Sequence, residues 1–129
     1  MAEPPGSYEF EPLSQRIIGA ALEVHTRLGP GFRESVYEEA LRLELDKRGI
    51  DWERGKVIAV QYDGVLVGTH RLDLVVSGSV VVELKAVSAF LEVRTAQLRA
   101  YLRAADLRVG LLLNFGAMPL GIKRLVNKY

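Results

Sequence analysis

The spacing of the apolar residues alternates between helical and extended periods along the chain, and the order of these periods constrains the fold more than any other feature. Apolar side chains that recur every three or four residues predict helices, and short runs rich in β-branched residues predict strands. The predicted helices span about residues 13–28, 34–48 and 88–105. The predicted strands span about residues 56–62, 65–76, 80–86 and 108–115, with a last edge strand at 120–126. A three-strand antiparallel meander, a helical crossover and a further strand give a mixed central sheet flanked by helices, so we expect an α/β fold with αβα layers.

Glycine-containing turns separate the predicted elements. Gly29-Pro30-Gly31 ends the first helix and Gly49 ends the second. Asp63-Gly64 is the strongest local signal for a two-residue hairpin, and Ser77-Gly78-Ser79 separates the next two strands. We expect a flexible N-terminal tail over residues 1–11 and a single domain over residues 12–129.

Composition excludes several classes of protein and favours one class of metal. No stretch has the roughly 18 uninterrupted apolar residues that a membrane span needs, and the N-terminus lacks the pattern of a secretory signal. With no cysteine and two histidines, a bound metal would be held by carboxylate and carbonyl oxygens, which favours Mg²⁺ or Mn²⁺ over Zn²⁺. We therefore expect a cytoplasmic protein without disulfides.

Charge is balanced overall but is distributed unevenly along the chain. The net charge of +1 does not by itself indicate nucleic-acid binding, which needs local basic patches. The last third of the chain is rich in basic residues: Arg94, Arg99, Arg103, Arg108, Lys123, Arg124 and Lys128. This asymmetry is compatible with contact between the last third of the chain and a polyanion.

Two charged residues interrupt the most apolar predicted strand, Val80-Val81-Val82-Glu83-Leu84-Lys85. Because successive side chains in a strand alternate between faces, Glu83 and Lys85 point the same way and Leu84 points the opposite way. The preceding strand has a matching acidic intrusion at Asp73. Charged side chains in such apolar surroundings indicate a site rather than a solvated surface.

The register between these two strands decides whether the two carboxylates meet. If Ser77-Gly78-Ser79 forms a three-residue loop, Asp73 faces Glu83, with Cβ atoms about 4.5–5.5 Å apart. A two-residue turn would instead pair Asp73 with Val82. Two carboxylates that close repel each other, and a bound cation would remove the repulsion.

These residues resemble the motifs of a known nuclease superfamily. Asp73 followed by Glu83-Leu84-Lys85 resembles the D…(D/E)xK signature of the PD-(D/E)XK nucleases. Residues 31–37, Gly-Phe-Arg-Glu-Ser-Val-Tyr, match the GxxExxY motif that names one bacterial and archaeal family in that superfamily. Leu72 stands where the superfamily name has proline, a departure to which we give little weight.

Two further segments extend the resemblance over roughly residues 13–124. Gln97-Leu98-Arg99-Ala100-Tyr101 resembles the QxxxY element that follows the ExK strand in exonuclease-like members. The strand end Leu112-Leu113-Asn114-Phe115-Gly116 is typical of the GxxExxY family. Taken in order, the four motifs are a much more specific signal than ExK alone.

The resemblance implies a restriction-endonuclease-like fold and divalent-metal-dependent hydrolysis of phosphodiester bonds in nucleic acid, with DNA favoured. It implies that Asp73 and Glu83 hold Mg²⁺ or Mn²⁺, with the Leu84 carbonyl as an extra oxygen ligand. Lys85 would position or activate the attacking water and stabilise the transition state.

Side chains on two helices complete the implied site. Glu34 resembles the additional carboxylate that many relatives supply from the first core helix, and Glu38, one turn further on, is the competing candidate. The residues implied to orient Lys85 or to contact a phosphate are Arg94, Gln97 and Tyr101, which share one side of the third helix.

Simpler interpretations of the same residues stay open. Glu83 and Lys85 can form a plain ion pair on an exposed sheet, and Glu34 can act only on the helix dipole. Tyr37 fits the core better than a catalytic role, and His70, near the strand mouth, is a lesser candidate for substrate contact.

Two alternatives to a nuclease are a catalytically inactive nucleic-acid binder and a protein-interaction domain, each retaining the same fold. A homodimer is a further expectation, with the apolar Leu111-Leu112-Leu113 and the C-terminal segment as candidate contacts.

Overall fold

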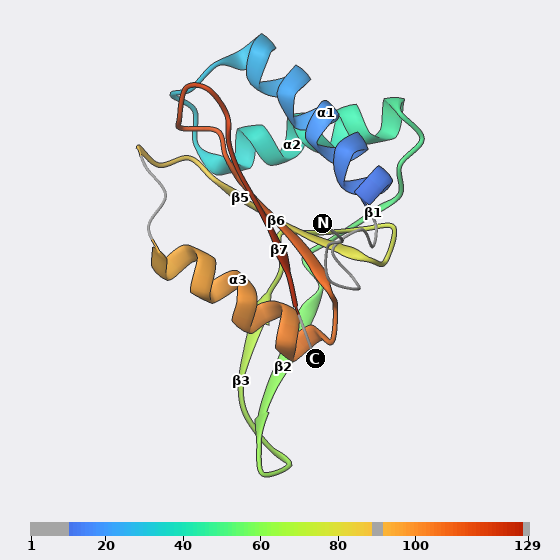
Figure 1. Cartoon of the computed structure of the whole chain (residues 1–129), viewed down its shortest axis with the longest axis vertical. Coiled ribbons are helices and arrows are strands. Elements are labelled where there is room, and N and C mark those ends of the chain that lie inside the picture. Colours follow the sequence, from blue (N-terminus) through green and yellow to red (C-terminus); the bar gives the residue numbers. More distant parts are fainter. Residues whose placement is uncertain (1–10, 89–91, 128–129) are drawn as a thin grey trace, which may run out of the picture.

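The computed structural model describes residues 11–88 and 92–127, so nearly all of the expected N-terminal tail lies outside the described residues (Figure 1). The helices in these ranges are α1 (Glu11–Leu28), α2 (Glu34–Lys47) and α3 (Glu92–Ala105). The strands are β1 (Trp52–Arg54), β2 (Val57–Tyr62), β3 (Val65–Arg71), β4 (Leu74–Val76), β5 (Val80–Lys85), β6 (Val109–Asn114) and β7 (Gly121–Val126). Residues 89–91 of the helix expected over 88–105 are likewise outside them, and residue 88 is not helical.

A five-stranded mixed sheet in the order β1-β4-β5-β6-β7 forms the centre of the fold. β5 and β6 are parallel and are connected through α3, whereas the other neighbouring pairs are antiparallel. Helices α1 and α2 pack on one face of the sheet and α3 on the other (Figure 1). The expected α/β class with αβα layers is confirmed, and the arrangement is that of a restriction-endonuclease-like fold.

The larger core lies between the sheet and the α1–α2 pair. Alternate residues of β5, including Val80, Val82 and Leu84, point into it because side chains in a strand alternate between faces. Tyr37 of α2 is fully buried there and its ring stacks on Phe115, with centroids 4.7 Å apart. The expectation that Tyr37 is a core residue is confirmed.

The second core lies between the other face of the sheet and α3. Leu98 and Leu102 of α3 are buried against Val81 and Leu112. A Cβ atom added at Gly110 would lie 3.1 Å from the Leu98 side chain, so glycine allows α3 to approach β6 closely. This packing brings α3 next to the polar residues at the end of β5.

Two features of the strands differ from the prediction. The strand expected over 65–76 is divided between β3 and β4, and β3 pairs only with β2, in a separate two-stranded hairpin that projects from the main sheet (Figure 1). The third strand of the antiparallel meander is instead the short β1, which was not predicted. With three residues, β1 is too short to show an alternating pattern.

The turns behave as predicted, but one surface expectation is wrong. Asp63 and Gly64, with φ of 52° and 75°, form the two-residue turn of the hairpin. Leu111-Leu112-Leu113 is at most 1% exposed because both faces of β6 are covered by helices, so it cannot form a dimer contact. Among the described residues, no helix has the length and apolar character needed to cross a membrane.

Candidate active site

The register of the β4–β5 hairpin is the one that brings the two carboxylates together. Val76 pairs with Val80 and Leu74 pairs with Val82, so a three-residue loop joins the strands. Counting one position further places Asp73 opposite Glu83. The predicted three-residue loop is confirmed, and the alternative pairing of Asp73 with Val82 is excluded.

Hydrogen bonds between side chain and backbone hold the acidic pair in place. The Leu84 backbone N–H donates to Asp73 Oδ2 at 2.9 Å, and the Asp73 backbone N–H donates to Glu83 Oε1 at 3.2 Å. These two hydrogen bonds connect Asp73 to β5 just beyond the end of β4, where the regular pairing of the two strands has stopped. Both carboxylates are therefore positioned by backbone atoms rather than by flexible side chains.

The Glu83 carboxyl lies in surroundings that disfavour its charge. Its residue is only 4% exposed, and burial together with the nearby charge of Asp73 raises its pKa to about 8. The charge of Lys85, on the same face of β5, lowers the pKa but does not offset these effects. Without a cation, this pair is poorly suited to carrying two negative charges.

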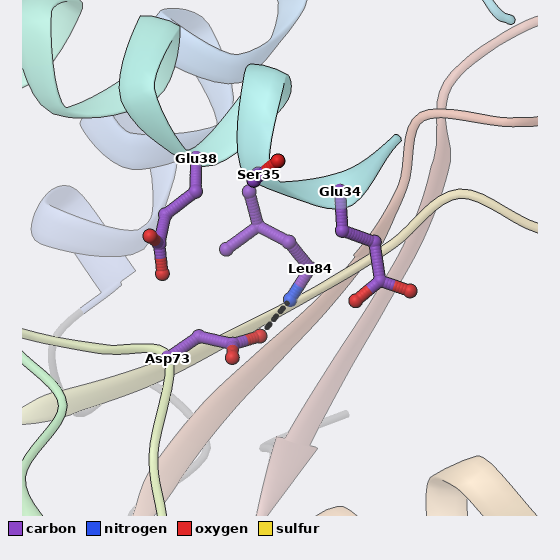
Figure 2. A pocket seen from close by; sticks show the side chains of 5 residues that line it. All are labelled: Glu34, Ser35, Glu38, Asp73 and Leu84. Atoms are coloured by element: carbon purple, nitrogen blue, oxygen red, sulfur yellow. Dashed lines mark hydrogen bonds between the residues drawn. The ribbon is translucent and has the colours of Figure 1, made fainter. Parts of the chain in front are cut away.

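A cavity of about 280 Å³ lies on the α2 side of the pair and is lined by Glu34, Ser35, Glu38, Asp73 and Leu84 (Figure 2). In Figure 2 the Glu38 carboxylate lies on the Asp73 side of Leu84, whereas that of Glu34 lies on the other side. The pKa of Glu38 is raised by burial and then by the charge of Asp73. Arg54 Nε lies 3.2 Å from Glu38 Oε2 and acts against this shift. Glu38 is thus electrostatically coupled to Asp73.

Tyr37 also positions the start of α2. Its hydroxyl donates to the Gly29 carbonyl at 2.6 Å and accepts from the Phe32 backbone N–H at 3.0 Å. These bonds tie the loop between α1 and α2 to the core, immediately before Glu34. The conformation of the loop is therefore linked to the placement of both α2 carboxylates.

On the α3 side, two aromatic rings lie beside the pair. His70 of β3 stacks on Tyr101 of α3, with centroids 3.7 Å apart and planes 11° apart. The pKa of Tyr101 is raised by burial and then by the charges of Glu83 and Asp73. The pKa of His70 is lowered chiefly by burial. The two rings therefore lie within the electrostatic field of the carboxylates.

The structure shows no contact that links Arg94 or Gln97, the other residues expected on α3, to Asp73 and Glu83 in the described part of the chain. Gln97 is exposed, and Arg94 is half-buried with an Nε that has no hydrogen-bond partner in the described part of the chain. Tyr101, the third of these residues, lies within the field of Glu83 and Asp73.

Two residues, His70 and Asn114, make contacts near the candidate site that the sequence did not predict. His70 was only a lesser candidate, yet it packs directly on Tyr101. Asn114 is fully buried at the end of β6, where Oδ1 accepts hydrogen bonds from the backbone N–H groups of Val87 and Gly116, both at 3.0 Å. The signal for Asn114 in the sequence is a polar residue at the end of an apolar strand. The hydrogen bond from Val87 fixes the backbone two residues after Lys85, where the chain leaves β5.

The donor set suits a hard cation only in part. Asp73 and Glu83 offer the oxygen atoms that Mg²⁺ prefers, and the raised pKa of Glu83 marks a repulsion that a cation would relieve. Within residues 11–88 and 92–127, however, no three His, Asp or Glu side chains are grouped closely enough to form a metal site. The fit of a metal therefore rests on the facing pair and on the acidic cavity beside it.

Comparison with known proteins agrees with this fold. The model of the PD-(D/E)XK nuclease superfamily matches residues 11–125, so the chain belongs to this superfamily, whose members are generally nucleases. No curated protein matches. The crystal structure of SSO0001 is similar, with a TM-score of 0.59, 16% identity, and coverage of 74% of this chain and 50% of that one. At this identity the likeness supports the fold alone, and the chain spans half the length of that protein.

Proposed function

We propose that this protein is a divalent-metal-dependent nuclease of the GxxExxY family that hydrolyses phosphodiester bonds in DNA. The observation that carries the proposal is the pairing of Asp73 with Glu83, with Lys85 on the same face of β5. The proposed metal ligands are Asp73, Glu83 and the Leu84 carbonyl, and the proposed cation is Mg²⁺ or Mn²⁺. A cytoplasmic location and a homodimer stay predictions of the sequence.

Each proposed role follows from the position of the side chain. When bound, a divalent cation supplies an activated water and positive charge opposite the phosphate. Lys85 places an ammonium group near Glu83, where it can orient that water and stabilise charge on the phosphate. Glu38 or Glu34, across the cavity, can hold the water network on the α2 side.

The substrate would approach over α3. Tyr101 offers a hydroxyl near the carboxylate pair, and Arg94 and Gln97 lie on the same side of the helix. Arginine and amide side chains contact phosphate oxygens and so fix the position of the nucleic-acid backbone. We propose this substrate-binding role for all three residues.

A second candidate function is non-catalytic nucleic-acid binding, because the described residues include no cluster of three potential metal ligands. Such a protein would bind DNA without metal and would tolerate Glu83→Gln and Lys85→Ala without losing affinity. A nuclease with the proposed site would lose cleavage in both variants.

The deciding experiment incubates the purified protein with single-stranded, duplex and branched DNA in the presence of Mg²⁺ or Mn²⁺. We expect cleavage by the wild type, none in EDTA, and none by Asp73→Asn. The matched control is Asp63→Asn, which removes the same charge from an exposed turn whose left-handed conformation asparagine also adopts. Cleavage by Asp73→Asn at the wild-type rate, or no cleavage of any substrate by the wild type, would overturn the proposal.

A further inference from the structure

A basic pocket lies on the flank of α3 that faces away from the acidic pair. It has a volume of about 470 Å³ and lies between α3 and the edge strand β7. Its lining residues are Arg99, Arg103, Arg124, Leu125, Val126 and Asn127, with no acidic side chain among them. Two of its cationic side chains, those of Arg99 and Arg103, come from α3, whereas Arg124 lines the pocket from β7.

The arginines on α3 lack the acidic neighbours that other arginines have. Arg99 and Arg103 form no ion pair within the described part of the chain. Elsewhere, glutamates pair with Arg27, Arg42, Arg48 and Arg54. Arg124 is positioned by its Nε, which donates to the Ser14 hydroxyl of α1 at 3.5 Å. Arg99 and Arg103 therefore present positive charge to the pocket that the described acidic groups do not neutralise.

Helix geometry places this pocket within reach of a chain that passes the candidate active site. Arg99 and Arg103 each follow a core leucine of α3, so they project to one flank, whereas Tyr101 projects to the opposite flank. An α-helix with its side chains is about 10–12 Å across, which equals three or four nucleotide steps of about 3.4 Å along a strand. A backbone that crosses α3 from the acidic pair would thus reach the arginines within a few nucleotides.

The spacing of the arginines also suits a polyphosphate chain. Residues four apart in a helix lie about 6 Å apart along its axis, less than two nucleotide steps of about 3.4 Å. The guanidinium group donates two parallel hydrogen bonds to phosphate oxygens, which gives it geometric preference for this anion. Arg99 and Arg103 can therefore contact neighbouring phosphates where a strand, having crossed the helix, runs along the flank of α3.

We propose that the α3–β7 pocket is a second phosphate-binding site, which holds the nucleic-acid backbone a few nucleotides away from the cleaved bond. The proposal rests on the proposed function for the nature of the ligand, but its binding step needs no metal and no catalysis. Arg99 and Arg103 make the contacts, and β7 forms the other wall of the pocket.

The test measures binding of fluorescein-labelled single-stranded and duplex DNA in EDTA across a series of salt concentrations. Arg99→Ala/Arg103→Ala is compared with the control Arg27→Ala/Lys47→Ala, which removes the same charge at two exposed cations that have glutamate partners. We expect the first variant to bind duplex roughly tenfold or more weakly at moderate salt. Its log–log salt slope should fall by about 2, because each phosphate that is no longer neutralised lowers the slope by about 0.9. The control variant should retain most of the wild-type affinity and most of its salt slope.

Arg99→Lys/Arg103→Lys separates charge from hydrogen-bond geometry. This variant should keep the salt slope and show intermediate affinity, because lysine retains the charge but not the paired donors. Circular dichroism melts of every variant verify that the fold is intact. Equal affinity of the Arg99→Ala/Arg103→Ala variant and the wild type would overturn the proposal, as would an equal loss in the control.

Cleavage assays on the same proteins separate this proposal from the proposed function. DNA binding that depends on Arg99 and Arg103, without cleavage by the wild type, would support the second phosphate site and refute the nuclease. Cleavage that depends on Asp73, with normal binding and cleavage by the arginine variants, would support the nuclease and refute the second site.

Discussion

The carboxylate of Asp73 accepts a hydrogen bond from the backbone N–H of Leu84 at 2.9 Å, so one side chain both joins two strands and faces Glu83. Its structural role needs an acceptor oxygen, whereas the chemical role proposed for it needs a negative charge. The two roles can therefore be separated by substitution.

Asp73→Asn keeps an acceptor for the Leu84 N–H and removes the charge. We expect a free energy of unfolding equal to or higher than that of the wild type at neutral pH, because repulsion with Glu83 is relieved, and cleavage reduced on the order of a hundredfold or more. Asp73→Ala should lose cleavage as well, but it should unfold more easily than the wild type by about 1–3 kcal/mol, because the buried N–H of Leu84 loses its hydrogen-bond partner. Urea denaturation and a cleavage assay measure both effects. Identical stabilities of the two variants would argue against the structural role.

Stability in EDTA should fall as pH rises from about 4.5 towards 8. The folded pKa of Glu83, about 8, lies above its ordinary value of 4.5, so in this interval the folded protein binds more protons than the unfolded chain does. The contribution of Glu83 is thus fully present below pH 4.5 and is lost as pH rises through 8. The difference in unfolding free energy between the wild type and Glu83→Gln isolates this residue from Glu38 and His70. A difference that does not change with pH would contradict the expectation.

Glu38→Gln should reduce cleavage more than Glu34→Gln does. Both residues line the cavity, and the pKa of Glu38 is raised by burial and then by the charge of Asp73. We expect a loss of about 10–100-fold for Glu38→Gln and a smaller one for Glu34→Gln, with titration of Mg²⁺ reporting the change in metal affinity. The reverse order would assign the helix carboxylate to Glu34.

Tyr101→Phe should separate the stacking of Tyr101 on His70 from the role of its hydroxyl. The variant keeps the ring contact, so we expect thermal stability close to that of the wild type and a changed kcat or KM. His70→Ala removes the contact and should lower stability by about 0.5–1.5 kcal/mol beyond the loss of buried area. Thermal melts and steady-state kinetics provide the measurements. If kcat and KM of Tyr101→Phe equal those of the wild type, the hydroxyl has no part in the reaction and Tyr101 serves only in packing.

Gly116→Ala should disturb the chain that follows Lys85. A Cβ atom at this position would lie 2.5 Å from the Val87 carbonyl oxygen, so the backbone must move, at a cost of about 1–3 kcal/mol. Gly68→Ala is the control, because its Cβ would meet no atom within 4 Å. Denaturation curves compare the two variants, and equal stability would contradict the close approach.

Local patterns predicted most of the elements. The helices expected over 13–28 and 34–48 correspond to α1 and α2, and the strand expected over 108–115 corresponds to β6. Apolar spacing within one element is enough for such predictions, because it records which face must be buried. The break between β3 and β4 was not predicted. At this break the Asp73 side chain accepts a hydrogen bond from Leu84, eleven positions further along the chain, and such a contact leaves no mark in the local apolar pattern.

Within the candidate site, the sequence by itself determined the residue types, the shared face of Glu83 and Lys85, and two possible registers. Only the tertiary structure decided between those registers, stacked His70 on Tyr101 and placed Glu38 within the field of Asp73. It also placed β7 beside Arg99 and Arg103 of α3, so that they line one pocket. The physical reason is that strand alternation and helix periodicity are local, whereas the distance between charges on different elements depends on how the layers pack.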